Sequence, residues 1–247
     1  MPVFTPRALV SLYQPLRAYL EQRLGRAVVL ETATDFRAFY RHLSAGVYDL
    51  ALAPAHLTRL VQQEIGWQPV AIYTAPNRAY VIMSHARPVR DIGALRGQRL
   101  AIFDPLALNV MITLAWLRAQ GLEPGRDFEV VETPGHASVA YAVVNGDALL
   151  GVTAQAAVAL MPAELRDKFA IFAVMPRIPS LVWGVHPRLA AEAQRLQQLL
   201  LAFPDSAEGR EFFRNTPYGG LRRIEAHELK SVEPYLPELI ERLRGRP

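Results

Sequence analysis

Residues Leu95–Leu117 read Leu-Arg-Gly-Gln-Arg-Leu-Ala-Ile-Phe-Asp-Pro-Leu-Ala-Leu-Asn-Val-Met-Ile-Thr-Leu-Ala-Trp-Leu, and the rest of the chain is organised around them. Arg99–Phe103 is a short apolar run typical of a β-strand, and after it the apolar residues recur with a period near 3.6. The pattern predicts a strand, a tight turn and a helix, with Asp104 as the N-cap and Pro105 in the first helical position. The backbone amides of Leu106–Asn109 would then be unpaired, and such a helix start suits an anion or a polar head group.

Strands and helices alternate along the remaining sequence. Apolar periodicity and Gly or Pro punctuation predict helices at 6–24, 35–44, 54–61, 136–144, 154–160, 190–203, 206–213 and 234–243. Strands are predicted at 28–31, 48–53, 68–74, 79–84, 128–132, 148–153, 169–174 and 180–185. This alternation predicts an α/β fold of mainly parallel sheets covered by helices on both faces.

Composition limits the classes of function. The 247 residues, 51% of them hydrophobic, can bury two cores with a cleft between them, which is the arrangement we expect. The net charge is +4, but the basic residues are scattered and the longest adjacent pair is Arg222-Arg223, so no nucleic-acid partner is expected. Cysteine is absent, which excludes disulfides and thiolate chemistry. No apolar run reaches membrane-spanning length, and Met1-Pro2-Val3 does not begin a signal peptide.

The sequence lacks three common signatures of enzymes and metal sites. The sequence has no Gly-x-Ser-x-Gly elbow and no phosphate-loop spacing with a following Lys-Ser/Thr. The six histidines show no i, i+4 pair, so we expect no metal site. We therefore expect a protein that is not an enzyme and needs no cofactor.

Five polar residues are candidates for ligand contact because they follow predicted strands or begin predicted helices. His136 and His56 lie near strand ends, where open α/β sheets bind ligands, although a capping histidine and a surface histidine are the simpler interpretations. Asn109 would lie in the first turn of its helix, facing either a cleft or solvent. Asn77 fits an exposed turn as well as a crossing between lobes, and Ser138 fits a plain helix start.

Several short motifs, taken in order, resemble one family. They are Leu16-x-x-Tyr19-Leu20-Glu21-x-x-Leu24-Gly25, Asp35-Phe36, Gly46-x-Tyr48-Asp49-Leu50-Ala51, Leu95-Arg96-Gly97, Phe103-Asp104-Pro105, Gly135-His136 and Tyr218-Gly219-Gly220-Leu221. Their order and spacing over nearly the whole chain resemble the phosphonate/phosphite-type periplasmic substrate-binding proteins of ABC importers. That resemblance implies a type 2 periplasmic-binding fold, with one lobe at 1–77 plus 177–247, a second at 78–176, and two crossing strands between them. The family usually opens with a strand before the loop that matches Val3–Pro6, and this sequence lacks that strand.

The resemblance also assigns site residues. His136 matches a family residue that donates a hydrogen bond to the ligand oxyanion, and Phe36 stands where the family often has a tyrosine. The family's hydroxyl-rich anion loop is replaced here by Ala107-Leu108-Asn109-Val110, which keeps the backbone amides and loses most side-chain donors. The expected head-group site is thus the amides of Leu106–Asn109 with His136, faced by Phe36 and His56 from the other lobe.

The leading interpretation is a monomeric periplasmic protein that captures a small, anionic, phosphonate-, phosphite- or phosphate-like solute. Its closed form would dock transiently on an inner-membrane ABC permease. An extracytoplasmic sensing domain on the same scaffold is one alternative, and a biosynthetic enzyme of this fold is another, because fold does not determine function.

Overall fold

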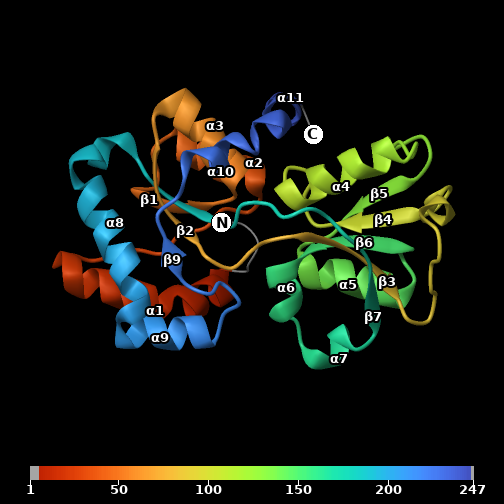
Figure 1. Cartoon of the computed structure of the whole chain (residues 1–247), viewed down its shortest axis with the longest axis horizontal. Helices are drawn as coiled ribbons and strands as arrows, with labels where there is room; N and C mark the ends of the chain where they lie inside the picture. Colours follow the sequence, from red (N-terminus) through yellow and green to blue (C-terminus); the bar gives the residue numbers. More distant parts are fainter. Residues whose placement is uncertain (1–5, 246–247) are drawn as a thin grey trace. The chain divides into compact units, whose positions relative to one another are not determined.

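The computed structural model describes residues 6–245, which divide into two compact units (Figure 1). Unit 1 contains residues 6–76 and 179–245, and unit 2 contains residues 77–178. The expected lobe boundaries, at 77/78 and 176/177, lie within two residues of these divisions. The loop expected at Val3–Pro6 lies, apart from Pro6, outside the described residues, as does the start of the chain at Met1-Pro2-Val3.

Unit 1 combines a four-stranded sheet with seven α-helices among its described residues. The helices are α1 (Pro6–Leu24), α2 (Phe36–Ser44), α3 (Ala55–Ile65), α8 (Ala193–Ala202), α9 (Ala207–Arg214), α10 (Ala226–Lys230) and α11 (Leu236–Arg244), and the strands are β1 (Leu50–Ala53), β2 (Gln68–Tyr73), β8 (Val182–Val185) and β9 (Leu221–Arg222). Short 3₁₀ turns at Pro187–Glu192, Phe203–Asp205 and Glu233–Tyr235 join the C-terminal helices. In Figure 1, α1 and α9 lie side by side below this sheet.

Helix α1 has the predicted bounds. Its stripe of Leu9, Leu16 and Leu20 is buried, as an amphipathic helix on a core requires. Gly25 ends it with φ +67°, a left-handed conformation that glycine adopts without strain, and its N–H donates to Glu21 O over 3.0 Å.

The sheet of unit 1 corrects the expectation of mainly parallel strands. Its order is β1-β8-β2-β9, and every pairing in it is antiparallel. Strands β1 and β2 run in the same direction, but β8 returns from the C-terminal half of the chain and lies between them in the opposite direction. Hydropathy patterns indicate which residues are buried but not in which direction a strand runs. They could therefore not reveal that β8 lies between β1 and β2.

A second correction concerns Val28–Glu31. The sequence predicts a strand there, because Val28, Val29 and Leu30 form a short apolar run. In the structure they form no strand, and Val29 remains 77% exposed. Strand propensity alone does not create a strand when no neighbouring strand pairs with the segment.

Unit 2 is a five-stranded mixed sheet between helices. Its strands are β3 (Ala79–Ser84), β4 (Arg99–Ile102), β5 (Glu129–Glu132), β6 (Leu150–Ala154) and β7 (Phe169–Val174), and its helices are α4 (Leu108–Ala119), α5 (His136–Asn145), α6 (Gln155–Ala159) and α7 (Ala163–Arg166), with a 3₁₀ turn at Ile92–Leu95. The order is β5-β4-β6-β3-β7. Strand β4 is parallel to β5 and β6, whereas β3 is antiparallel to β6 and β7. Helices α4 and α5 cover opposite faces of the sheet (Figure 1).

The close packing of α5 on the sheet depends on Gly151 in β6. A Cβ atom at this position would lie 2.6 Å from Val139 Cγ1 and 2.8 Å from Val143 Cγ2, both on α5. These valines belong to the buried core of unit 2, together with Ile82 and Ala101. The glycine therefore sets the distance between α5 and β6, and with it the position of the first residue of α5, His136.

We predict that Gly151→Ala lowers the free energy of unfolding by about 1–3 kcal/mol, because an added methyl group must displace two valines in a packed core. Urea unfolding followed by circular dichroism measures the change. Gly135→Ala is the matched control, since its φ of 169° is ordinary extended backbone and nothing lies within 4 Å of the added atom. Equal stability of the two variants would contradict this account of the packing.

Candidate functional site

Three parallel strands bring most of the predicted site residues to one edge of unit 2. Since β4 is parallel to β5 and β6, the carboxyl ends of all three strands lie at the same edge of the sheet. Asn109 follows β4, His136 follows β5 and Gln155 follows β6. Thr133 ties two of these ends together, because its N–H donates to Ile102 O over 2.8 Å and its Oγ1 lies 3.2 Å from the same carbonyl.

Helix α4 begins three residues later than the sequence predicts. Asp104 does not cap it: its Oδ1 accepts from Leu106 N over 2.8 Å, and its carbonyl accepts from Ala107 N over 3.1 Å. These bonds close a turn before the helix, so two of the four amides expected to be unpaired are in use. The short side chain of an aspartate readily accepts a hydrogen bond from the backbone N–H two residues further on. For Asp104 this bond to Leu106 N replaces a helix cap.

The unpaired donors of α4 are therefore fewer than expected. Ala107 is the N-cap without a side-chain hydrogen bond, and the first helical bond joins Met111 N to Ala107 O over 3.0 Å. The amides of Leu108 and Asn109 have no hydrogen-bond partner among residues 6–245. Two adjacent unpaired N–H groups at the start of a 12-residue helix form a site of positive potential.

Asn109 adds a side-chain donor at the same place. The residue is only 6% exposed, and its Nδ2 atom has no hydrogen-bond partner among the described residues. A buried amide nitrogen without a partner costs about 1–3 kcal/mol relative to one that is hydrogen-bonded. Such a cost in the free protein is removed when a ligand supplies an acceptor, so this side chain is suited to hold an oxygen atom.

His136, the first residue of α5, is held by two neighbours. Its Nδ1 lies 3.0 Å from the hydroxyl of Thr153, a fully buried residue of β6, and its ring lies 4.1 Å from that of Phe103, centroid to centroid. When the Thr153 hydroxyl donates to Nδ1, the proton of the neutral imidazole resides on Nε2, which is then available as a donor.

Burial lowers the pKa of His136 from 6.5 to about 4. The imidazole is therefore neutral at pH 7 and offers a single N–H. An anion bound beside it would raise this pKa again, because a nearby negative charge stabilises the imidazolium. Binding of an anion therefore favours binding of a proton at His136.

For the other candidate residues in unit 2, no side-chain donor or acceptor is both buried and without a partner among the described residues. Ala107 and Leu108 are buried and contribute backbone alone. Asn77 accepts a hydrogen bond from Arg78 N through its own Oδ1 over 3.0 Å and forms a bridge to Ile178, so its side chain stabilises a turn. Ser138 lies half-buried in the first turn of α5.

Unit 1 contains the remaining two candidates, Phe36 and His56. Phe36 is the first residue of α2, where Asp35 is the N-cap and accepts from Ala38 N over 2.7 Å, and it is 1% exposed. His56 is the second residue of α3 and is fully buried. The interpretation of His56 as a surface histidine is therefore wrong.

Sequence reasoning overlooked Thr153 as a site residue. It lies near the carboxyl end of a strand, which is a usable signal, but its role depends on the approach of His136 from another loop. Gln155, the first residue of α6, has a buried Oε1 without a hydrogen-bond partner among the described residues. The role of Thr153 depends on a neighbour distant in the sequence, which a sequence pattern does not reveal.

Metal binding finds no support in the part of the chain that the structure describes. Within residues 6–245, no group of three or more histidine, aspartate or glutamate residues is arranged to hold a metal ion. The two backbone amides, the carboxamide NH2 of Asn109 and the neutral imidazole N–H of His136 are hydrogen-bond donors of the kind that an oxyanion accepts from.

The family model for "ABC transporter, phosphonate, periplasmic substrate-binding protein" matches residues 1–229. The chain belongs to this family. It is therefore a solute-binding component of an ABC importer that takes a small ligand, and its family works outside the cytoplasm as transport proteins. Among residues 6–245, no helix combines the length and apolar character that a membrane crossing requires.

Solved structures of similar proteins show the same type 2 periplasmic-binding fold, which confirms the fold class. A phosphonate-binding protein from Prochlorococcus marinus in complex with methylphosphonate, PhnD1, has 11% identity and a TM-score of 0.85 over 98% of this chain and 96% of its own. A binding-protein component of an ABC phosphonate transporter from Pseudomonas aeruginosa has 14% identity and a TM-score of 0.82, covering 98% and 95%. A Xanthomonas citri protein bound to chloride ion has 18% identity and a TM-score of 0.79, covering 96% and 95%.

The lowered pKa of His136 makes the stability of this binding protein dependent on pH. The unfolded chain binds a proton at this residue below pH 6.5, whereas the folded chain does so only near pH 4. Stability from His136 is therefore present above pH 6.5 and is lost as pH falls toward 4, by about 2 kcal/mol between pH 7 and pH 5.

His136→Gln should remove this part of the pH dependence, and urea unfolding at pH 7 and pH 5 for both proteins measures it. The matched control is His85→Gln, which removes an exposed imidazole from the same unit and should leave the wild-type difference intact. An unchanged pH dependence in His136→Gln would contradict a neutral, buried imidazole.

Proposed function

We propose that the transported solute is a small oxyanion of the phosphonate, phosphite or phosphate type. It would be held in unit 2 by the amides of Leu108 and Asn109, by Asn109 Nδ2 and by His136. The observation that carries the proposal is the buried, unpartnered Nδ2 of Asn109 beside two unpaired amides at a helix N-terminus.

The donor set favours a compact ligand with few charges. Four N–H groups of neutral residues can satisfy the oxygens on one side of a tetrahedral anion, and no arginine or lysine is part of the set. The methylphosphonate complex of the Prochlorococcus marinus protein supports this ligand class, because that protein shares the fold over nearly its whole length.

The two units would act as lobes that close on the ligand. The proposal also assigns ligand contact to Phe36 and His56 of unit 1 and to Ala107, Ser138 and Asn77 of unit 2, as the family resemblance and the strand ends suggest. Closure in type 2 binding folds proceeds around a hinge of a few residues, and the divisions at 76/77 and 178/179 are where such a hinge would lie. The closed monomer in the periplasm would be the form that the inner-membrane permease recognises.

Thermal unfolding tests the ligand class directly. Phosphite, methylphosphonate, phosphate and sulfate are each added at millimolar concentration, and ligand at about 100 times its Kd should raise Tm by about 5–10 °C. Glycine methyl ester, a cation of similar size, is the control and should have no effect. The absence of a shift with all four anions would remove the proposal.

Asn109→Ala should weaken binding of the anion that gives the largest shift by about 10- to 100-fold, because one hydrogen bond to a charged group is lost. The unliganded protein should not lose stability, because Nδ2 makes no hydrogen bond with a described residue and the substitution removes a buried polar group without a partner. Titration calorimetry compares this variant with Asn145→Ala, which removes an exposed asparagine at the other end of α5. Wild-type affinity in Asn109→Ala would contradict the assigned site.

A further inference from the structure

Gln155 contains a buried acceptor that the proposed anion site does not use. Within residues 77–178, the buried side-chain nitrogen and oxygen atoms without a hydrogen-bond partner are Asn109 Nδ2 and Gln155 Oε1. The first is a donor and the second is an acceptor. A buried polar atom without a partner is unfavourable, and an anion that only accepts hydrogen bonds relieves the donor alone. The acceptor requires a hydrogen that the ligand must supply.

The backbone around Gln155 determines the direction of its side chain. Strand β6 ends at Ala154, whose φ of −99° and ψ of 145° continue the extended conformation up to Gln155. Alternate residues of an extended chain project from the same face, so Gln155 and Thr153 share one face at the end of β6. The N–H of Gln155 donates to Arg78 O over 2.9 Å, which fixes the residue beside the start of β3.

The face that carries Thr153 and Gln155 is also the face on which His136 lies. Gly151 has the same orientation two residues before Thr153, and a Cβ atom there would meet side chains of α5. His136 is the first residue of α5, and its Nδ1 lies 3.0 Å from the Thr153 hydroxyl. The acceptor of Gln155 therefore lies two residues beyond the threonine that orients the imidazole.

The register of the sheet relates Gln155 to the start of α4. Strands β4 and β6 are parallel, with Ala101 opposite Gly151. Continued by four residues, this register brings Gln155 level with Pro105, in the turn that leads into α4. Neighbouring strands lie about 4.8 Å apart. Because α4 and α5 cover opposite faces of the sheet (Figure 1), an anion at this edge would have the amides of α4 on one side and His136 with Gln155 on the other.

We propose that Gln155 selects an oxyanion that keeps one hydrogen on its oxygen atoms, as in the monoanion of a phosphonate, phosphite or phosphate. This inference rests on the proposed function and specifies the protonation state of that ligand. The N–H donors hold the unprotonated oxygens, and the P–OH group donates to Gln155 Oε1. A sulfonate or sulfate has the same tetrahedral shape but no O–H group at neutral pH. One of its oxygens would therefore face the glutamine oxygen, and the two would repel each other.

An ammonium group on the ligand is a less suitable donor for this position. It has three N–H groups, and each of them requires an acceptor when it is buried. Within residues 77–178, Gln155 Oε1 is the one buried side-chain acceptor without a partner, and its carboxamide carries no charge to balance a cation. A single neutral acceptor matches a single O–H group.

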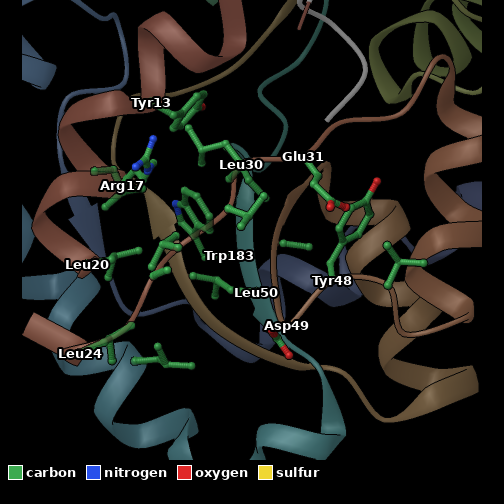
Figure 2. Close-up of a pocket in the computed structure, with 18 of the residues that line it drawn as sticks. Tyr13, Arg17, Leu20, Leu24, Leu30, Glu31, Tyr48, Asp49, Leu50 and Trp183 are labelled. Carbon is green, nitrogen blue, oxygen red and sulfur yellow. The ribbon is translucent and has the colours of Figure 1, made fainter. Parts of the chain in front are cut away.

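A cavity of about 360 Å³ in unit 1 is a separate feature and does not supply this acceptor. Figure 2 shows leucines around it, from α1, from the segment at 26–31 and from β1. Arg17 in its lining is paired with Glu21 over 3.3 Å. Arg26 is paired with Glu192 over 3.0 Å. An anion loses hydration on binding and gains little from apolar walls and arginines that are already paired.

The test compares methylphosphonate with methanesulfonate at pH 7, by titration calorimetry with the whole protein. The two anions have the same shape, and only the methylphosphonate monoanion carries an O–H group. Wild-type protein should bind methylphosphonate about 10- to 100-fold more tightly, because methanesulfonate leaves the buried acceptor without a donor. Gln155→Met removes the acceptor at nearly constant side-chain length and should bring the two affinities to within about threefold of each other. Gln120→Met, at the exposed C-terminal end of α4, is the matched control and should keep the wild-type preference.

The outcomes separate this inference from the proposed function. Equal affinity of the wild-type protein for the two anions would overturn the inference and leave the anion site intact, whereas failure of both anions to bind would remove the anion site and the inference with it. The wild-type comparison needs no variant, so it decides the matter even if Gln155→Met does not fold.

The variant adds three results that would contradict the role of Gln155. A full wild-type preference in Gln155→Met would show that another group makes the selection. An equal loss of affinity for both anions would show that the carboxamide donates through its nitrogen. Tighter binding of aminomethylphosphonate than of methylphosphonate, abolished in Gln155→Met, would show that the acceptor serves an ammonium group.

Discussion

The parallel alignment of β4 with β5 and β6 is the constraint on which the proposed ligand site depends. It brings the segments after three strands to one edge, where Thr133 bonds to Ile102 and links the ends of β4 and β5. Gly151 lets α5 approach the sheet closely enough for His136 to reach Thr153. Each residue of the site is thus placed by backbone hydrogen bonds and packing that belong to the fold itself.

The hydrogen-bond donors proposed for the site in unit 2 are all uncharged. His136 is uncharged because desolvation lowers its pKa to about 4, and Asn109 Nδ2 and the amides of Leu108 and Asn109 have no hydrogen-bond partner among residues 6–245. A neutral donor set binds an anion without the attraction of a full positive charge, so affinity depends on the number and direction of hydrogen bonds. This arrangement fits a binding protein that must also release its solute to a permease.

Within residues 6–245, each of the two sheets ends in strands that pair on one side only. In unit 2, the central β4, β6 and β3 each pair on both sides, and the sheet edges fall at β5 and β7. In unit 1, the edge strand β1 borders an apolar cavity and not solvent alone.

Much of the local structure was predictable. The bounds of α1, β3 and β7 agree with the sequence pattern, because a helix or strand with one buried face imposes a period that the sequence must carry. The ordered motifs were sufficient to indicate the family, which the family model then confirmed. His136 and Asn109 could be selected because they follow strands.

The sequence by itself determined the helices, most strands and the α/β class, since these depend on contacts between residues close along the chain. Only the tertiary structure decided that β8 lies between β1 and β2, that Asp104 closes a turn and does not cap α4, and that Val28–Glu31 pairs with no described strand. It also decided the burial of Phe36 and His56. These features depend on hydrogen bonds and packing between distant segments, and a linear pattern of hydrophobic residues does not encode which segments meet.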